Sequence, residues 1–99
     1  MEYQKSIWIT GPLDDAYIWY SELDAERWEH RVIVEFRDGY LEYSSLATEP
    51  IYNWISEKPW PKMETTVNFD QQVLNQNEFE DLWVQALKTG QHGITRQRI

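Results

Sequence analysis

The segment from Asp14 to Glu29 holds most of the side chains in this sequence that could bind a partner or take part in chemistry. It interleaves six acidic residues with aromatic ones. Aromatic anchors within a charged rim are typical of protein interfaces. We therefore predict that this segment binds a partner through Asp14, Asp15, Tyr17, Trp19, Glu22, Asp24, Glu26 and Glu29. The alternative is that the acids form a solvated surface and the rings belong to the core.

Neither histidine fits the requirements of a catalytic base. His30 alternates with Trp28 and Val32 on an apolar face of a predicted strand, whereas a catalytic histidine needs a cleft and an orienting carboxylate. We therefore expect His30 to be a core or rim residue. His92 has glycines on both sides close by, so it lacks the rigid support that a catalytic group requires.

The acidic residues do not form a catalytic or metal-binding pattern. Glu35 faces Glu42 across a predicted hairpin, but this pair lies on an open sheet face where water and salt screen it. Residues 14–15 and 24–26 lack the number of ligands and the loop glycine of a calcium site, and the chain has no cysteine. We therefore expect no catalytic residue, no metal and no cofactor.

Four short runs of β-branched and aromatic residues predict the strands that position these side chains. They are residues 6–10, 16–22, 28–37 and 40–46. Asp38-Gly39, between the last two runs, is a strong signal for a two-residue hairpin turn. Such a turn pairs Phe36 with Leu41 across the hairpin. A fifth strand is expected from residues 50–56 or from residues 70–75.

This pairing gives the predicted sheet one apolar face and one charged face. Val32 and Val34 lie on the apolar face, which we expect to form the core. Continuing the pairing into the preceding strand places Tyr17, Trp19 and Ser21 on the charged face. The residues of that strand on the apolar face are Ala16, Ile18 and Tyr20.

One amphipathic helix is predicted near the end of the sequence. Asn77 is a good N-cap with Glu80 at the third helical position, the arrangement of a capping box. Apolar residues then recur at helical spacing, namely Phe79, Leu82, Trp83, Ala86 and Leu87. Gly90 is a natural stop, and we expect residues 90–99 to form a flexible tail. A short second helix is predicted to start near Lys62.

These elements predict an α+β fold, with a mainly antiparallel sheet of four to five strands in meander order and the C-terminal helix packed on one face. The length of 99 residues and the 41% hydrophobic content suit a single domain over residues 1–99. No run of about 18 apolar residues is present, and the first residues lack the order of a signal peptide. We therefore expect a cytoplasmic protein without a membrane partner. For its own assembly, we expect a monomer or weak homodimer.

The net charge of −8 is concentrated in residues 1–50, which contain eleven acids and four bases. A protein that follows nucleic-acid phosphates needs a basic face, so this balance argues against nucleic acid and favours a basic partner. The alternative is that the charge only keeps a small protein soluble.

Several short motifs in the first half of the chain resemble a known family. They are Met1-Glu2-Tyr3, Ile7-Trp8, Tyr20-Ser21-Glu22-Leu23-Asp24, Glu26-Arg27-Trp28-Glu29 and Phe36-Arg37-Asp38-Gly39. Together they are similar to a family of small acidic bacterial domains of unknown function, some of which are immunity proteins of polymorphic toxin or contact-dependent growth inhibition systems. The family offers no catalytic motif, and residues 47–77 do not match it closely.

The resemblance implies a non-enzymatic immunity protein, an antitoxin that binds and neutralises a cognate bacterial toxin. Carboxylates could stand where the active site of a basic nuclease expects phosphates, so a nuclease toxin covered by the acidic, aromatic-rich surface is the expected partner. Two alternatives stay open, a small carboxylate-dependent hydrolase or nucleotide-processing enzyme, and an acidic housekeeping adaptor. Immunity surfaces are specific through local contacts, so no motif identifies the toxin.

Overall fold

The computed structural model of the chain describes residues 1–45, 54–56 and 58–92. These residues form one sheet and one helix. The elements are β1 (Glu2–Trp8), β2 (Ala16–Leu23), β3 (Glu29–Phe36), β4 (Leu41–Ser45), β5 (Phe69–Val73), α1 (Gln76–Thr89) and β6 (Gln91–His92). The predicted α+β class, with a mainly antiparallel sheet and a C-terminal helix packed on it, is confirmed.

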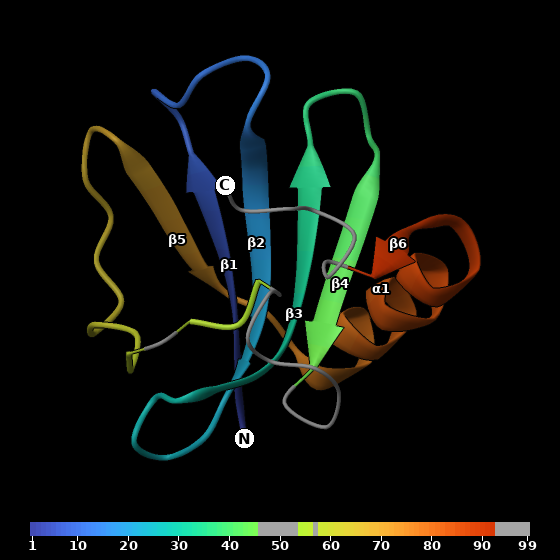
Figure 1. Cartoon of the computed structure of the whole chain (residues 1–99). Coiled ribbons are helices and arrows are strands. Elements are labelled where there is room, and N and C mark those ends of the chain that lie inside the picture. The colour runs from blue at the N-terminus through green and yellow to red at the C-terminus, as the bar shows by residue number, and fades with distance from the viewer. Residues whose placement is uncertain (46–53, 57, 93–99) are drawn as a thin grey trace.

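The strands lie in the order β5-β1-β2-β3-β4-β6 (Figure 1). β1 to β4 form the predicted meander, each strand antiparallel to the next. β5 runs antiparallel along the other edge of β1, which confirms the second of the two predicted places for a fifth strand. Gln91 and His92 form the short β6, parallel to β4, whereas residues 93–99 of the predicted tail lie outside the described residues.

The hairpin between β3 and β4 differs from the predicted two-residue turn. The Phe36 N–H donates to the Tyr40 carbonyl at 2.9 Å, so the loop contains three residues, and its last residue, Gly39, has a left-handed φ of 88°. This is a common three-residue hairpin loop with glycine in the left-handed position. The register therefore pairs Leu41 with Glu35 and not with Phe36. A shift of one residue moves every side chain of β4 to the opposite face.

The register of β2 also differs from the prediction, because its pairing with β3 shifts between Ala16 and Ile18. Ile18 and Tyr20 pair with Glu35 and Ile33, so they do not share a face with Val32 and Val34 as predicted. Ala16 does pack with those two valines. A β-bulge of this kind inserts one extra residue into a strand and leaves no clear mark in the hydrophobic pattern.

Both faces of the sheet are covered as a result. The first, which we call the helix face, packs against α1. The larger core cluster lies between the two and consists of Tyr3, Ile18, Tyr20, Ile33, Leu41, Leu74, Phe79 and Ala86. The second, which we call the aromatic face, carries Val32 and Val34 and is covered by Ile55 and Trp54. The segment of residues 58–66 contains no helix, so the short helix predicted near Lys62 is wrong.

The N-cap of α1 lies two residues before the predicted cap. Asn75 is the N-cap, and its side chain and that of Glu78 form the capping box. Leu74, just before the cap, packs in the same buried cluster as Phe79, as in a hydrophobic staple. The predicted stop at Gly90 is confirmed, since its N–H donates to the Ala86 carbonyl at 2.8 Å.

A charged cluster joins α1 to the helix face. Arg31 of β3 makes ion pairs with Glu22 at 2.7 Å and with Glu80 of α1 at 2.8 Å. Its guanidinium lies 5.0 Å from the ring centroid of Phe79 and 5.1 Å from that of Trp83. The hydrogen bonds from Arg31 lower the pKa values of both carboxyls. Glu22 is therefore a structural anion within the fold.

Candidate functional site

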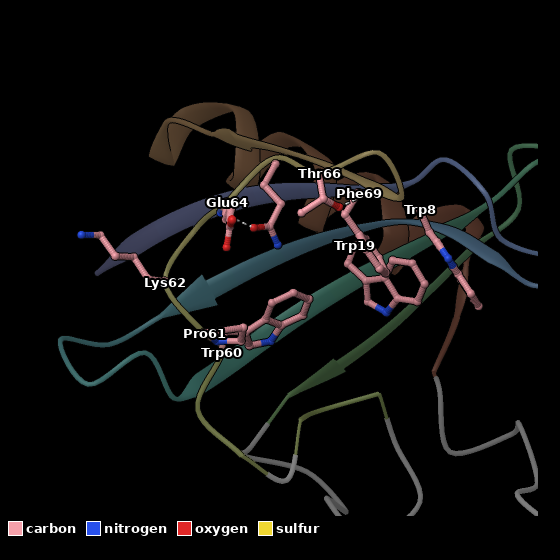
Figure 2. A pocket seen from close by; sticks show the side chains of 9 residues that line it. Trp8, Trp19, Trp60, Pro61, Lys62, Glu64, Thr66 and Phe69 are labelled. Carbon is pink, nitrogen blue, oxygen red and sulfur yellow. Dashed lines mark hydrogen bonds between the residues drawn. The ribbon is translucent and has the colours of Figure 1, made fainter.

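The described residues border a cleft of about 490 Å³ on the aromatic face. Three strands supply its sheet side, through Trp8 of β1, Trp19 of β2 and Phe69 of β5. Trp60 and Pro61 form the opposite wall (Figure 2). Polar residues complete the lining, namely Lys62, Glu64, Thr66 and Gln71. We call this the aromatic cleft.

The strand register brings the rings of the sheet side together. Trp8 is the cross-strand neighbour of Phe69, and their rings stack at 6.0 Å between centroids. Trp19 pairs with Ser6, two residues before Trp8, so the two tryptophans are diagonal neighbours across β1 and β2, with ring centroids 6.2 Å apart. Trp54 continues the row at 6.4 Å from Trp19. Large aromatic side chains reach both direct and diagonal cross-strand neighbours, so the sheet builds a continuous aromatic surface.

Arg27 holds the backbone of the opposite wall. It lies in the turn between β2 and β3 with a φ of 67°, a left-handed conformation. Its carbonyl accepts the Trp60 N–H at 2.9 Å, and its Nε donates to the carbonyls of Trp60 and Pro61, each at 3.1 Å. The guanidinium also pairs with Glu2 at 3.1 Å. This one side chain therefore ties the Trp60 wall to the sheet.

Glu29 holds the ring of the same wall. Its Oε2 accepts the indole N–H of Trp60 at 3.1 Å, and its Oε1 accepts the Ser56 N–H at 2.9 Å. The residue is only 2% exposed, and burial raises the pKa of its carboxyl to about 7, although these two hydrogen bonds act in the opposite direction. Glu29 also borders a second cavity of about 410 Å³, shared with Trp19 and Trp60.

The raised pKa of Glu29 predicts a pH-dependent stability. Its usual pKa is 4.5, so between about pH 4.5 and pH 7 the folded state binds more protons than the unfolded state, and stability falls as pH rises. Glu29→Gln cannot ionise and escapes this loss. The stability of Glu29→Gln relative to the parent should therefore rise by up to about 3 kcal/mol from pH 4.5 to pH 8. Urea unfolding across this range measures the difference.

Glu64→Gln is the matched control, because it changes an exposed carboxyl at the rim of the same cleft. Subtracting the parent curve removes the contributions of the other carboxyls, which titrate in all variants. A stability difference for Glu29→Gln that stays constant with pH would mean that folding does not raise the pKa of Glu29.

The predicted partner-binding residues do not form one surface. Asp14 and Asp15 lie in the loop between β1 and β2, and Tyr17 lies at the start of β2, where the Arg37 guanidinium is 4.1 Å from its ring centroid. Asp24 and Glu26 lie beyond the other end of that strand. Glu22 is buried on the helix face and Glu29 on the aromatic face. Of the eight predicted residues, Trp19 lines the aromatic cleft and Glu29 supports it.

Asp24 stabilises the turn between β2 and β3. Its Oδ1 accepts the N–H groups of Glu26 and Trp28, each at 3.0 Å. Its Oδ2 lies 2.9 Å from His30 Nε2, and this hydrogen bond is the main cause of the lowered pKa of the Asp24 carboxyl. His30 is half-buried, as expected for a rim residue.

The expected proximity of Glu35 and Glu42 is wrong, because the true register places them on opposite faces of the sheet. Glu35 accepts the Tyr20 hydroxyl at 2.7 Å on the helix face, and Glu42 accepts the Trp54 indole N–H at 2.7 Å on the aromatic face. Within the described parts of the chain, no group of three or more acidic or histidine side chains could hold a metal ion.

The sequence analysis missed most of the site, including Trp8, Arg27, Trp60 and Phe69. They come from the β1 strand, a turn, an irregular proline-rich segment and the β5 strand, so no local spacing connects them. The one usable signal was the unusual number of tryptophans, six in the whole chain.

Among the described residues, no helix is long and apolar enough to cross a bilayer.

The fold and the site together define a small α+β domain that carries an aromatic cleft on one sheet face. The family described as "Domain of unknown function (DUF6881)" has a model that matches residues 2–88, so the chain belongs to this family. The match confirms the expected relation to a family of unknown function. No curated protein and no solved structure matched the chain.

Proposed function

We propose that this chain is a bacterial, cytoplasmic immunity protein, which binds a cognate toxin and neutralises it by covering the active site of the toxin. The partner is a basic protein domain, a nuclease being the class that suits an acidic inhibitor. The chain acts by binding and catalyses no reaction. The observation that carries this proposal is the open aromatic cleft on a chain of net charge −8.

The charge supports a basic protein partner. Complementary charge steers a basic partner toward an acidic one and raises the rate of association. Several exposed carboxylates lie around the fold, including Asp14, Glu26 and Glu64. Nucleic acid would be repelled by the same charge.

The aromatic cleft supports a binding function. Tryptophan is enriched among the few residues that dominate interface energies, and such anchors are surrounded by polar residues that exclude water. Trp8, Trp19 and Trp60 are all partly exposed in the cleft, with Glu64 and Lys62 at its edge. The cleft is held from behind by Arg27 and Glu29, so its shape exists before a partner arrives. A preformed site loses less entropy on binding.

The second candidate function is a carboxylate-dependent hydrolase. It is favoured by one observation, the raised pKa of Glu29 next to an open cavity. Perturbed carboxyls in cavities are common in active sites. However, both oxygens of Glu29 already accept hydrogen bonds, and the residue is 2% exposed, so a substrate cannot reach it without displacing Trp60. Positioning of Trp60 accounts for the same facts.

The experiment that tests the proposal starts from the gene directly upstream. An immunity gene should follow a large toxin gene, whose C-terminal domain should arrest growth when it is expressed alone. Co-expression of this chain should restore growth. Absence of a toxin gene upstream, or growth arrest that persists when this chain accumulates to a verified level, would contradict the proposal.

A further inference from the structure

We propose that the aromatic cleft receives an arginine side chain of the partner and holds its guanidinium against the tryptophan rings. This inference deepens the proposed function, and it rests on that function only in assuming that the partner is a protein. The binding chemistry itself is a property of the cleft, formed by Trp8, Trp19, Trp60 and Phe69.

The lining of the cleft suits a flat cation. The faces of aromatic rings are electron-rich, indole most of all, and they attract cations within about 6 Å of the ring centroid. Three of the four rings are indoles. The guanidinium of arginine is planar and weakly hydrated, so it stacks on rings at a lower desolvation cost than the ammonium of lysine. A cleft of about 490 Å³ also has room for the aliphatic part of such a side chain.

Two carboxyl groups add to the attraction. The Trp60 indole N–H donates to the Glu29 carboxyl at 3.1 Å, and this hydrogen bond polarises the indole ring and increases its electron density. Glu64 adds a carboxylate at the rim. Lys62 is the opposing charge there, but its ammonium points away from the rings in Figure 2. Arg27 is already neutralised by Glu2.

The chain already places its own cations on other rings. Arg37 lies over Tyr17 and Arg31 over Phe79 and Trp83, with centroid distances of 4.1, 5.0 and 5.1 Å. A Lys5 ammonium lies 5.8 Å from the Tyr20 ring. None of these rings lines the aromatic cleft. Within the described residues, the rings of the cleft are therefore free to accept a cation from outside.

The test compares two probes that differ in charge and little in shape, N-acetyl-arginine amide and its neutral analogue N-acetyl-citrulline amide. NMR titration of the purified chain follows the indole N–H signals. The arginine probe should shift the signals of Trp19 and Trp60 saturably, and it should bind about tenfold more tightly than the citrulline probe. Equal binding of both probes would identify a site for neutral ligands and overturn the proposal, as would a lack of binding by either.

Variants locate the binding. Trp60→Leu should abolish the preference for the arginine probe, whereas Trp28→Leu should keep it, because Trp28 is 44% exposed and lines none of the cavities described above. Lys62→Gln changes only an exposed rim cation and should strengthen arginine binding about twofold. Retained preference in a folded Trp60→Leu, or weaker arginine binding in Lys62→Gln, would overturn the proposal. Because these probes involve no toxin, a failure here leaves the immunity function to its own test.

Discussion

Phe79→Ala should destabilise the fold by about 3 to 5 kcal/mol, the typical loss for truncating a fully buried phenylalanine. Phe79 is 0% exposed, and its ring packs against Tyr3 at 5.0 Å and lies beneath the Arg31 guanidinium. Its loss opens a cavity at the point where α1 meets the sheet. A small domain has a total stability of about 5 to 15 kcal/mol, so this loss is a large fraction of it. Urea unfolding monitored by circular dichroism measures the change.

Two other helix positions give the comparison. Val84→Ala, at a position 48% exposed on the same helix, should stay within about 0.5 kcal/mol of the parent. Trp83→Ala should cost less than Phe79→Ala, because Trp83 is only partly buried and packs edge-on against Tyr43. If Phe79→Ala unfolds at nearly the urea concentration of the parent, α1 does not pack on the helix face as described.

Trp60→Ala should raise the dissociation constant for the toxin by at least about 30-fold, the equivalent of a hot-spot loss of 2 kcal/mol. The change removes one wall of the aromatic cleft but none of the sheet. Most of the effect should appear as faster dissociation, because the charge that steers association is unchanged. Surface plasmon resonance with the toxin domain measures both rates.

Trp28→Ala is the matched control for this experiment. It removes an exposed tryptophan in the turn between β2 and β3, outside the aromatic cleft. Its affinity should stay within about threefold of the parent, as expected for a residue outside the interface. The opposite pattern, with Trp28→Ala weakened and Trp60→Ala unchanged, would move the interface from the aromatic cleft to the turn between β2 and β3.

The fold class and the strands could be predicted from the sequence, but the faces of the sheet could not. Asp38-Gly39 correctly marks the hairpin, yet this dipeptide suits both a two-residue loop and a three-residue loop with glycine at its end. The observed three-residue loop moves Leu41 to the helix face. The bulge near Tyr17 has a similar effect in β2. Two local irregularities thus decide which rings meet.

The start of α1 was ambiguous in the sequence for a different reason. Asn75 and Asn77 each have a glutamate three positions later, so both fit a capping box. The hydrophobic staple distinguishes them, because Leu74 precedes Asn75 and can pack on Phe79, whereas a polar residue precedes Asn77. This information was present in the sequence.

The candidate site was only partly predictable. Trp19 and Glu29 belong to the predicted acidic and aromatic segment and take part in the cleft. Trp60 belongs to a segment with prolines on both sides and no periodicity, so only the tertiary contacts with Arg27 and Glu29 place it against the sheet. The roles of the acidic residues were harder to predict. Glu22 is neutralised by Arg31 within the fold, but its residue type does not distinguish it from the exposed acids nearby in the sequence.

The most direct test of the immunity function is the activity of the purified toxin domain, titrated with this chain. The proposal predicts that an equimolar amount of the chain abolishes the activity of the toxin, and that Trp60→Ala reaches the same inhibition only in excess. The toxin retaining full activity in a large excess of the folded parent chain would contradict it.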